Sequence, residues 1–413
     1  MAPRKSQPRG AQVTSNGPAN HTDVDYESVP PFFNTTFSTH RVSPLYIGPQ
    51  GLTTARLEHL AHRLRDTLVG DVVRGIQVGL EAADTPMGQV GPLRAVTIRW
   101  FHAQSILGEA AVDQGSEEAW NKFSGEQGRG LWIEICHENA TYVALLLPGF
   151  SSSADDAAAQ QPAWVVQPSN ADVDKSQFTH LPLLLLRMPQ ALKAVIGEWL
   201  STTFDCHVGK LTLGTKTLIN VWEGWIRTSG LPSKGPDFVL TISFNAPTTE
   251  RQSAVPSDSD GELGEDNDSV EPGLKSLEIT ISPSDLRRFL RAGQEGGAHE
   301  RTTSAAWTID LRERRRIAGE NMDDGWGWRT SEDAPKHPFT EALARYLDHH
   351  LALDLFHPGV RVVQISCGAF VLAQSRLKIV KLGDVTSDLA RAAWMFVAQL
   401  GARIRGDALP AVV

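Results

Sequence analysis

The chain has 413 residues, of which 41% are hydrophobic and 21% are charged, a composition typical of globular proteins and not of fibrous or membrane proteins. Its length exceeds the size at which one hydrophobic core usually stops growing, so we expect two lobes or one elongated sheet. The formal net charge of −9 is concentrated between Glu250 and Glu271, where eight acidic residues stand with one arginine. The rest of the chain is close to neutral, which neither supports nor excludes contact with nucleic acid.

The N-terminal composition and the cysteines indicate the cellular compartment of the protein. Residues 1–28 are rich in Pro, Gly, Ser, Asn and Gln and predict a disordered, weakly basic tail without the apolar centre of a signal peptide. No later run approaches the roughly 20 apolar residues of a membrane span, so we expect no contact with a membrane. Cys136, Cys206 and Cys367 lack metal or redox spacing, which predicts reduced, buried thiols in a nuclear or cytosolic protein.

The folded part opens with a strand and a helix. From Phe33 to Arg41, β-favouring and polar side chains alternate, and the pattern stops at Pro44. From Thr53 to Leu68, apolar residues recur at three- and four-residue spacing, with Gly70 just beyond as a helix stop. The sequence therefore predicts a half-buried opening strand followed by an amphipathic helix.

Further elements follow from the same two periodicities. Strands are predicted at Leu93–Phe101, Leu131–His137, Thr141–Leu147, Val208–Leu213, Phe238–Phe244, Leu274–Ile281, Trp307–Leu311, Val360–Ile365 and Ala369–Leu382. Helices are predicted at Pro189–Phe204, Asp285–Leu290, Phe339–Leu353 and Ser387–Ile404. The hairpin of 131–147 and the strands that need covering helices indicate an α+β fold with one sheet face open.

Composition divides this fold into segments. We expect a disordered tail (1–28), an N-terminal α+β lobe (29–150), a linker (151–170) and a C-terminal α+β lobe (171–413) with disordered insertions at 247–273 and 292–304. The predicted fold class is α+β, with mixed, largely antiparallel sheets covered by helices on one face, in two lobes, with a disordered N-terminal tail and an acidic insertion. An open sheet face or edge of this kind needs a partner.

No catalytic, cofactor-binding or metal-binding residues are predicted. Gly209 to Gly214 is the nearest approach to a phosphate-binding loop, but one residue separates its second glycine from Lys216, and Leu211 and Leu213 alternate as in a strand. The His349–His350 pair matches no metal-ligand spacing, and adjacent helical residues point about 100° apart. The chain is therefore predicted not to be an enzyme and to need no cofactor.

Two arginine clusters are the densest basic features of the folded part, and they are candidates for contact with DNA or with an acidic partner, although a plain solvated surface is the simpler interpretation. Their members are Arg287, Arg288, Arg291, Arg312, Arg314, Arg315 and Arg316. Trp326 and Trp328 lie in a glycine-rich stretch and are either contact anchors or a loop packed over its own sheet.

Two stretches carry a resemblance to a known family. Thr39 to Tyr46 reads Thr-His-Arg-Val-Ser-Pro-Leu-Tyr, and Leu68 to Leu80 reads Leu-Val-Gly-Asp-Val-Val-Arg-Gly-Ile-Gln-Val-Gly-Leu. This wording resembles the CENP-L (centromere protein L-like) family of inner-kinetochore subunits, in a fungal member. The resemblance is strongest over residues 32–80 and extends in order of elements to the C-terminal strands and helix.

The resemblance implies a non-enzymatic subunit of the constitutive centromere-associated network in the nucleus, at the centromere and kinetochore. Such a subunit pairs with a CENP-N-like subunit through C-terminal sheet, works with other inner-kinetochore proteins and supports chromosome segregation. Auxiliary DNA contact and homodimerisation stay open. The alternatives are a nucleic-acid-binding module and an enzyme that uses an open-sheet cleft.

The residues themselves suggest where pairing occurs. The stretch Ala369 to Val380 is long, rich in β-favouring residues and punctuated by polar side chains, so it is a candidate edge strand for β-augmentation, with an internal strand as the alternative. The predicted partner-binding residues are Phe370, Leu372, Gln374, Arg376 and Lys378.

Overall fold

The computed structural model describes residues 29–73, 90–102, 105–106, 128–148, 177–231, 235–244, 274–295, 325–330, 337–381 and 386–405. The predicted tail, the linker at 151–170, the acidic insertion at 247–273, the strand at 307–311 and all but the first four residues of the insertion at 292–304 lie outside these residues.

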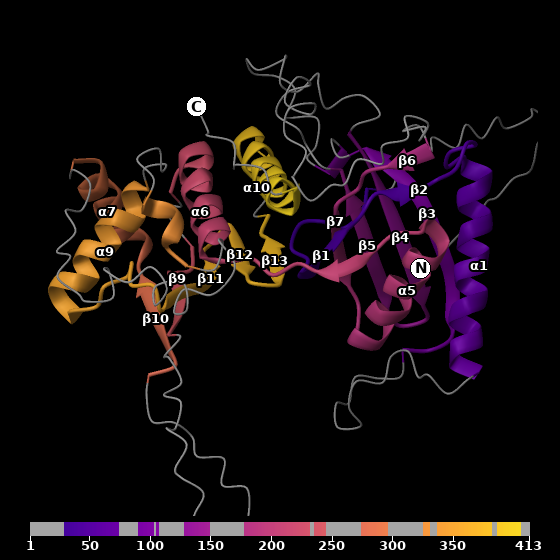
Figure 1. Ribbon diagram of the computed structural model, residues 1–413, viewed down its shortest axis with the longest axis horizontal. Helices are drawn as coiled ribbons and strands as arrows, with labels where there is room; N and C mark the ends of the chain where they lie inside the picture. The colour runs from indigo at the N-terminus through magenta and orange to yellow at the C-terminus, as the bar shows by residue number, and fades with distance from the viewer. Residues whose placement is uncertain are drawn as a thin grey trace, which may run out of the picture.

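Strands and helices are interleaved along the chain in both halves (Figure 1). The strands are β1 (Phe37–Val42), β2 (Leu45–Tyr46), β3 (Leu93–His102), β4 (Arg129–His137), β5 (Thr141–Leu147), β6 (Phe178–Thr179), β7 (Leu183–Arg187), β8 (Val208–Lys210), β9 (Phe238–Phe244), β10 (Ser276–Ile281), β11 (Val360–Ser366), β12 (Phe370–Ala373) and β13 (Arg376–Ile379). The helices are α1 (Thr54–Val73), α5 (Gln190–Phe204), α6 (Thr215–Ser229), α7 (Pro283–Glu295), α9 (Pro338–Leu351) and α10 (Ser387–Arg405), with a 3₁₀ turn, η5 (Gly327–Thr330).

One sheet runs through both halves of the described chain. Its order is β10-β9-β11-β12-β13-β1-β7-β5-β4-β3, with β8 as an eleventh strand paired to β1. Neighbours are antiparallel, and the halves join where β1 pairs with β13 at Phe37 and Leu377. The predicted α+β class with largely antiparallel sheet is confirmed, whereas the boundaries of the two lobes stay a prediction.

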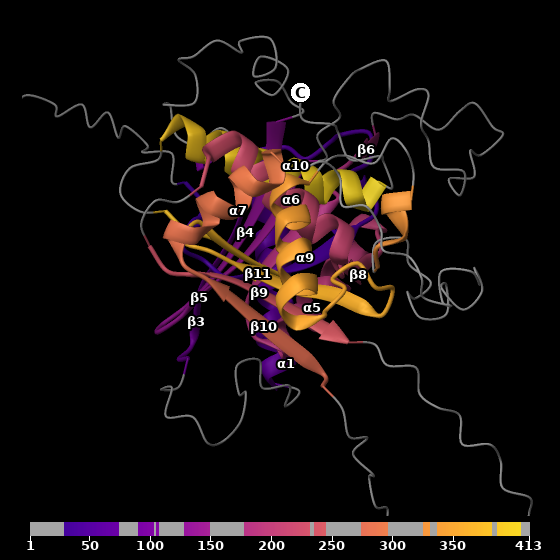
Figure 2. The same cartoon turned by 90° about the vertical axis from the view of Figure 1, so that its left-hand side faces the viewer.

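Helices cover opposite faces of the two halves. Because side chains alternate along a strand, Leu131 and Ile133 of β4 pack with α1 and α5, while Trp132 belongs to the core that contains α6 and α10. Phe238 and Phe370 of the C-terminal strands belong to that second core. Figures 1 and 2 show α6, α7, α9 and α10 together on one side of these strands. Among the described elements, no helix packs on the other face of β9 to β13, so the predicted open face belongs to these strands.

Several predicted elements are confirmed in place, including the hairpin β4–β5, the pair β9–β10 across the acidic insertion, and helices α5, α9 and α10. The opening strand differs, because it begins at Phe37 and not at Phe33. Asn34 has φ 58°, and its side chain bonds the backbone of Lys381, so a left-handed turn replaces the first residues of the predicted strand.

Helices extend further than predicted at two glycines. α1 continues past Gly70 to Val73, since one helical glycine costs only about 1 kcal/mol, which packing by Leu64 and Leu68 offsets. α7 continues to Glu295, so residues 292–295 of the predicted second insertion are helical. The predicted strand at Val208–Leu213 is shorter, and β8 ends at Lys210 before Gly214 begins α6.

Candidate docking surfaces

The predicted edge strand is inside the sheet. Residues 369–380 form a hairpin, in which β12 pairs with β11 and β13 pairs with β1. Phe370 and Leu372 are fully buried, Gln374 lies in the turn, and Arg376 and Lys378 lie on the sheet face opposite the core that contains α6 and α10. The edge assignment is therefore wrong, because both sides of this hairpin already have backbone partners. A partner contact by these five residues stays a prediction.

The C-terminal end of the sheet is β10. This strand pairs with β9 on one side, from Ser276 opposite Ser243 to Ile281 opposite Phe238, and no described strand lies on its other side. Leu277, Ile279 and Ile281 face the core, and the intervening residues are exposed. A terminal strand of this kind presents unpaired N–H and C=O groups to another chain.

The opposite end of the sheet, β3, carries protective features. Arg94 pairs with Glu138 at 2.9 Å, and Arg99 pairs with Glu134 at 3.3 Å. The β3–β4 register shifts between Leu93 and Ala95. Charges and bulges of this kind are the usual means by which natural edge strands avoid pairing with other chains.

The open face of the C-terminal strands is polar. Its side chains are those of Ser276, Glu278, Thr280, Val239, Thr241, Ser243, Arg361, Gln364, Val371, Ala373, Arg376 and Lys378. Most of these residues are small or polar and only part-buried, so the face does not form the apolar patch that a large hydrophobic interface needs.

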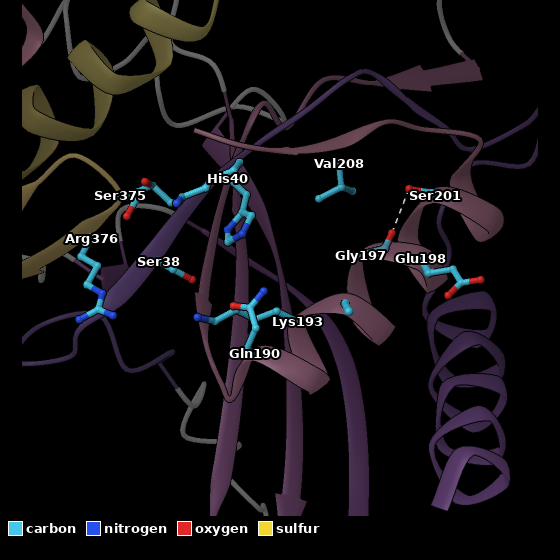
Figure 3. A pocket seen from close by; sticks show the side chains of 13 residues that line it. Ser38, His40, Gln190, Lys193, Gly197, Glu198, Ser201, Val208, Ser375 and Arg376 are labelled. Atoms are coloured by element: carbon cyan, nitrogen blue, oxygen red, sulfur yellow. Dashed lines mark hydrogen bonds between the residues drawn. The ribbon is translucent and has the colours of Figure 1, made fainter. Parts of the chain in front are cut away.

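A cavity of about 480 Å³ lies where this open face meets α5. Its walls come from β1, β8, the start of β13 and one side of α5, and its titratable residues are His40, Lys193, Glu198, Lys210 and Arg376. In Figure 3, His40, Gln190 and Lys193 lie together beside β1, while Glu198 extends away toward α1. Burial lowers the pKa of His40, the charges of Lys193 and Lys210 lower it further, and a backbone hydrogen bond at Ser38 opposes them.

Sequence reasoning did not find this cavity. His40, Lys193 and Lys210 come from three separate elements, β1, α5 and β8. His40 lies in the stretch 39–46 and Lys210 in the stretch 209–214, but neither pattern indicates that the two residues meet. Of the residues that line the cavity, only Arg376 is a predicted site residue, and it was predicted as part of the candidate edge strand. The antiparallel register that brings β1 beside β8 and β13 is a long-range property that local patterns do not reveal.

The predicted arginines divide into two groups. Arg287, Arg288 and Arg291 lie exposed on α7, the helix that follows β10 directly, and Arg288 pairs with Asp285 at 3.0 Å. Exposed pairs of this kind contribute little to stability. Arg312, Arg314, Arg315 and Arg316 lie outside the described residues.

The two candidate tryptophan anchors are buried. Trp326 is 3% and Trp328 is 8% exposed, and Trp326 packs edge-on against Phe356. Next to them, Arg329 lies over the ring of Phe356 and pairs with Glu341. The tryptophans therefore belong to the core. Of the two interpretations of this stretch, a loop packed over its own sheet is the one that agrees with the structure.

The phosphate-loop resemblance at Gly209 to Gly214 is contradicted by packing. The N-terminus of α6 is sealed within the protein, since Thr215 and Thr217 are fully buried and Thr215 Oγ1 accepts a hydrogen bond from the Val362 N–H at 3.0 Å. Within the described ranges, no three His, Cys, Asp or Glu side chains gather as a metal site. No described helix is long and apolar enough to cross a bilayer.

Comparison with known proteins identifies a family for this chain. The family model CENP-L, described as Centromere protein L, matches residues 31–408, which is nearly the whole chain and includes both sheet edges and the cavity. A search of curated proteins found no match. The extent of the family match confirms the resemblance seen at residues 39–46 and 68–80. The chain belongs to the CENP-L family, and it is a protein of the centromere and kinetochore in the nucleus that serves chromosome segregation.

Proposed function

We propose that this CENP-L-family chain is a non-enzymatic structural subunit that pairs with a CENP-N-like subunit and helps to anchor the inner kinetochore on centromeric chromatin. The pairing uses the free side of β10, so that the partner's sheet continues this one. The observation that carries the proposal is the position of β10 at the end of a continuous antiparallel sheet, with one side unpaired among the described strands.

The chemistry of β10 suits β-augmentation. The strand has six residues, one charge at Glu278, and no proline or lysine between Ser276 and Ile281. Its inner side chains are held by the core, and this pre-organises the backbone for a partner strand. By contrast, β3 has two ion-paired arginines and a register shift, which favour a protected edge.

The arginines of α7 lie next to this edge in the chain. Arg287 and Arg291 are exposed, about one and two turns into α7. We propose that they contact acidic groups of the partner, because arginine forms charge-assisted bonds with carboxylates and is enriched at interfaces. DNA contact by the same residues is auxiliary at most.

The non-enzymatic role is supported by how the perturbed groups are distributed. Glu223, whose pKa is raised to about 7 by burial, is 1% exposed within the core on the helix-covered side of the sheet. His40, whose pKa is lowered, lines the cavity on the opposite face. Catalytic acids and bases converge on one accessible cleft, and these two groups do not.

The proposal is tested by pairing assays with variants of the two sheet ends. Ser276→Lys with Thr280→Lys adds two charges at exposed positions of β10, and Ala95→Lys with Thr97→Lys is the matched control on β3. Each full-length chain is co-expressed with the CENP-N-like subunit of the same species, and the affinity of the purified pair is measured.

We expect the β10 variant to lose about tenfold or more in affinity, because lysine on an edge strand disfavours strand addition. The β3 variant should pair like the unmodified chain. Equal loss in both variants, or loss in the β3 variant alone, would refute pairing through β10. Failure of the unmodified chain to bind the CENP-N-like subunit would refute the proposed partner.

A further inference from the structure

The cavity beside β1 combines concavity with positive charge, and pairing through β10 does not involve it. Lys193 comes from α5, Lys210 from β8 and Arg376 from β13, so three separate elements bring a permanent cation to one place. Glu198 is the carboxylate among the lining residues, and its side chain points away from His40 and Lys193 (Figure 3). The lining therefore has an excess of two positive charges even when Glu198 is counted.

The positive charge is felt inside the cavity. Burial is the main cause that lowers the pKa of His40, and the charges of Lys193 and Lys210 lower this pKa further. Lysines that pointed apart into solvent would be screened from one another and from the ring. The first turn of α5 adds the positive end of its helix dipole, since Gln190 at the helix start also lines the cavity.

The shape of the cavity limits the ligand. Its volume of about 480 Å³ lies in the range of pockets that hold small molecules or one side chain with its flanking backbone. The hydroxyls of Ser38 and Ser201 donate to the backbone oxygens of Leu186 and Gly197, so recognition falls to the charged groups. A duplex needs a longer basic track, because its affinity comes from many phosphates bound along its length.

We propose that this cavity binds a phosphate monoester, presented as phosphoserine or phosphothreonine by a partner protein. A phosphate monoester carries about −1.5 to −2 charges at neutral pH, which matches the excess charge of the lining. A carboxylate or a phosphodiester carries only −1, so the same positively charged lining attracts it less strongly. Two ammonium groups and a guanidinium fork can together bond several oxygens of one phosphate.

The binding test uses alanine pentapeptides with blocked ends and a central phosphoserine, serine or glutamate, each labelled with fluorescein. Inorganic phosphate and a short DNA duplex are the competitors. The full-length chain is compared with Lys193→Gln, Lys210→Gln and the control Lys216→Gln, which lies on α6 across the sheet. Circular dichroism checks that each variant is folded.

We expect binding of the phosphoserine peptide alone, weakened about tenfold by either cavity substitution and unchanged by Lys216→Gln. Inorganic phosphate should compete more weakly than the unlabelled phosphopeptide. Binding of the glutamate or serine peptide at equal affinity, equal binding by all variants, or stronger competition by the duplex than by the phosphopeptide would each overturn the proposal.

A second measurement follows the titration of His40, which lines the cavity. The imidazole of His40 is followed by NMR, with its signal assigned through His40→Gln, as pH is varied with and without the phosphoserine peptide. A bound dianion offsets the lysine charges, so the pKa of His40 should rise when the peptide binds. An unchanged His40 titration at a peptide concentration that saturates binding would place the ligand elsewhere and refute the assignment.

Discussion

Glu223 of α6 accepts two hydrogen bonds from Thr340 of α9, one from the backbone N–H at 2.9 Å and one from the hydroxyl at 2.8 Å. Both residues are buried, so this contact fastens two helices above the C-terminal strands. A second polar contact lies one turn away, where Asn220 Oδ1 meets His337 Nε2 at 2.7 Å. The helix layer over β9 to β13 is therefore joined by buried polar groups as well as by apolar packing.

Burial makes this carboxyl group sensitive to pH. The pKa of Glu223 is raised from 4.5 to about 7, first by desolvation, with the bonds from Thr340 and the charge of Arg227 opposing the rise. Between these two values the folded chain holds a proton that the unfolded chain has released. The free energy of unfolding should thus fall as pH rises from about 4.5 to about 7, by on the order of 3 kcal/mol from this group.

Glu223→Gln should remove that dependence. The amide oxygen can still accept from Thr340, and no charge is buried at high pH. We expect the variant to match the unmodified chain at pH 5 and to exceed its unfolding free energy at pH 8, measured by urea denaturation. Glu198→Gln, at an exposed site, is the control. A variant that keeps the full pH slope would show that Glu223 is not its source.

Thr340→Val tests the hydroxyl half of the same contact. The substitution keeps the size and the backbone bond but removes one donor, so the pKa of Glu223 should rise further. We expect a loss of about 1–3 kcal/mol in unfolding free energy, larger at pH 8 than at pH 5. Thr67→Val on the exposed face of α1 should change stability by less than about 0.5 kcal/mol. Equal effects at both pH values would contradict the coupling.

Gly293 of α7 lies against Pro338 at the start of α9. A Cβ atom at this position would overlap the carbonyl group of Pro338, and backbone cannot yield as a side-chain tip can. Gly293→Ala should lower the unfolding free energy by about 2 kcal/mol or more. Gly70→Ala is the matched control, because nothing lies within 4 Å of its Cβ position, and it should stabilise α1 by about 0.5–1 kcal/mol. Stabilisation by both substitutions would contradict the described helix packing.

The arginines of α7 give a prediction that depends on salt. If Arg287 and Arg291 contact acidic groups of the partner, their joint replacement by alanine should weaken pairing about two- to tenfold at low salt, and the difference should shrink at high salt. The control is Arg63→Ala with Arg65→Ala, at two exposed positions of α1. The affinity of pairing is measured for both double variants at two salt concentrations. An equal loss of affinity in the α7 variant and the α1 control would show that α7 does not lie in the interface.

Sequence patterns located most elements because their periodicity is local. Phe238 to Phe244 alternates so regularly that β9 and its partner β10 could be recognised on either side of the acidic insertion. The error at residues 369–380 also has a local cause. Phe370 and Leu372 face the core, and so do Leu377 and Ile379. Residues on one face of a single strand are separated by an even number of positions, but Leu372 and Leu377 are separated by an odd number. That change of phase was the available signal for the turn at Gln374 and Ser375.

Other features had no local signal. Gly293 stands in a glycine-rich stretch that favours an insertion, yet its lack of a side chain is what lets α7 pack against Pro338. The burial of Glu223 depends on α9, more than 100 residues later in the chain. The change of helix-covered face at β1, which creates both the open face and the cavity, follows from the strand order of the whole sheet.

The central claim is tested most directly by hydrogen exchange of the backbone amides in the free chain and in its complex with the CENP-N-like subunit. Amides of β12 and β13 should be protected already in the free chain, because both strands have neighbours. On complex formation, β10 should gain protection at residues 276–281, while β3 exchanges as before. Unchanged exchange in β10, together with new protection in β3, would contradict the account.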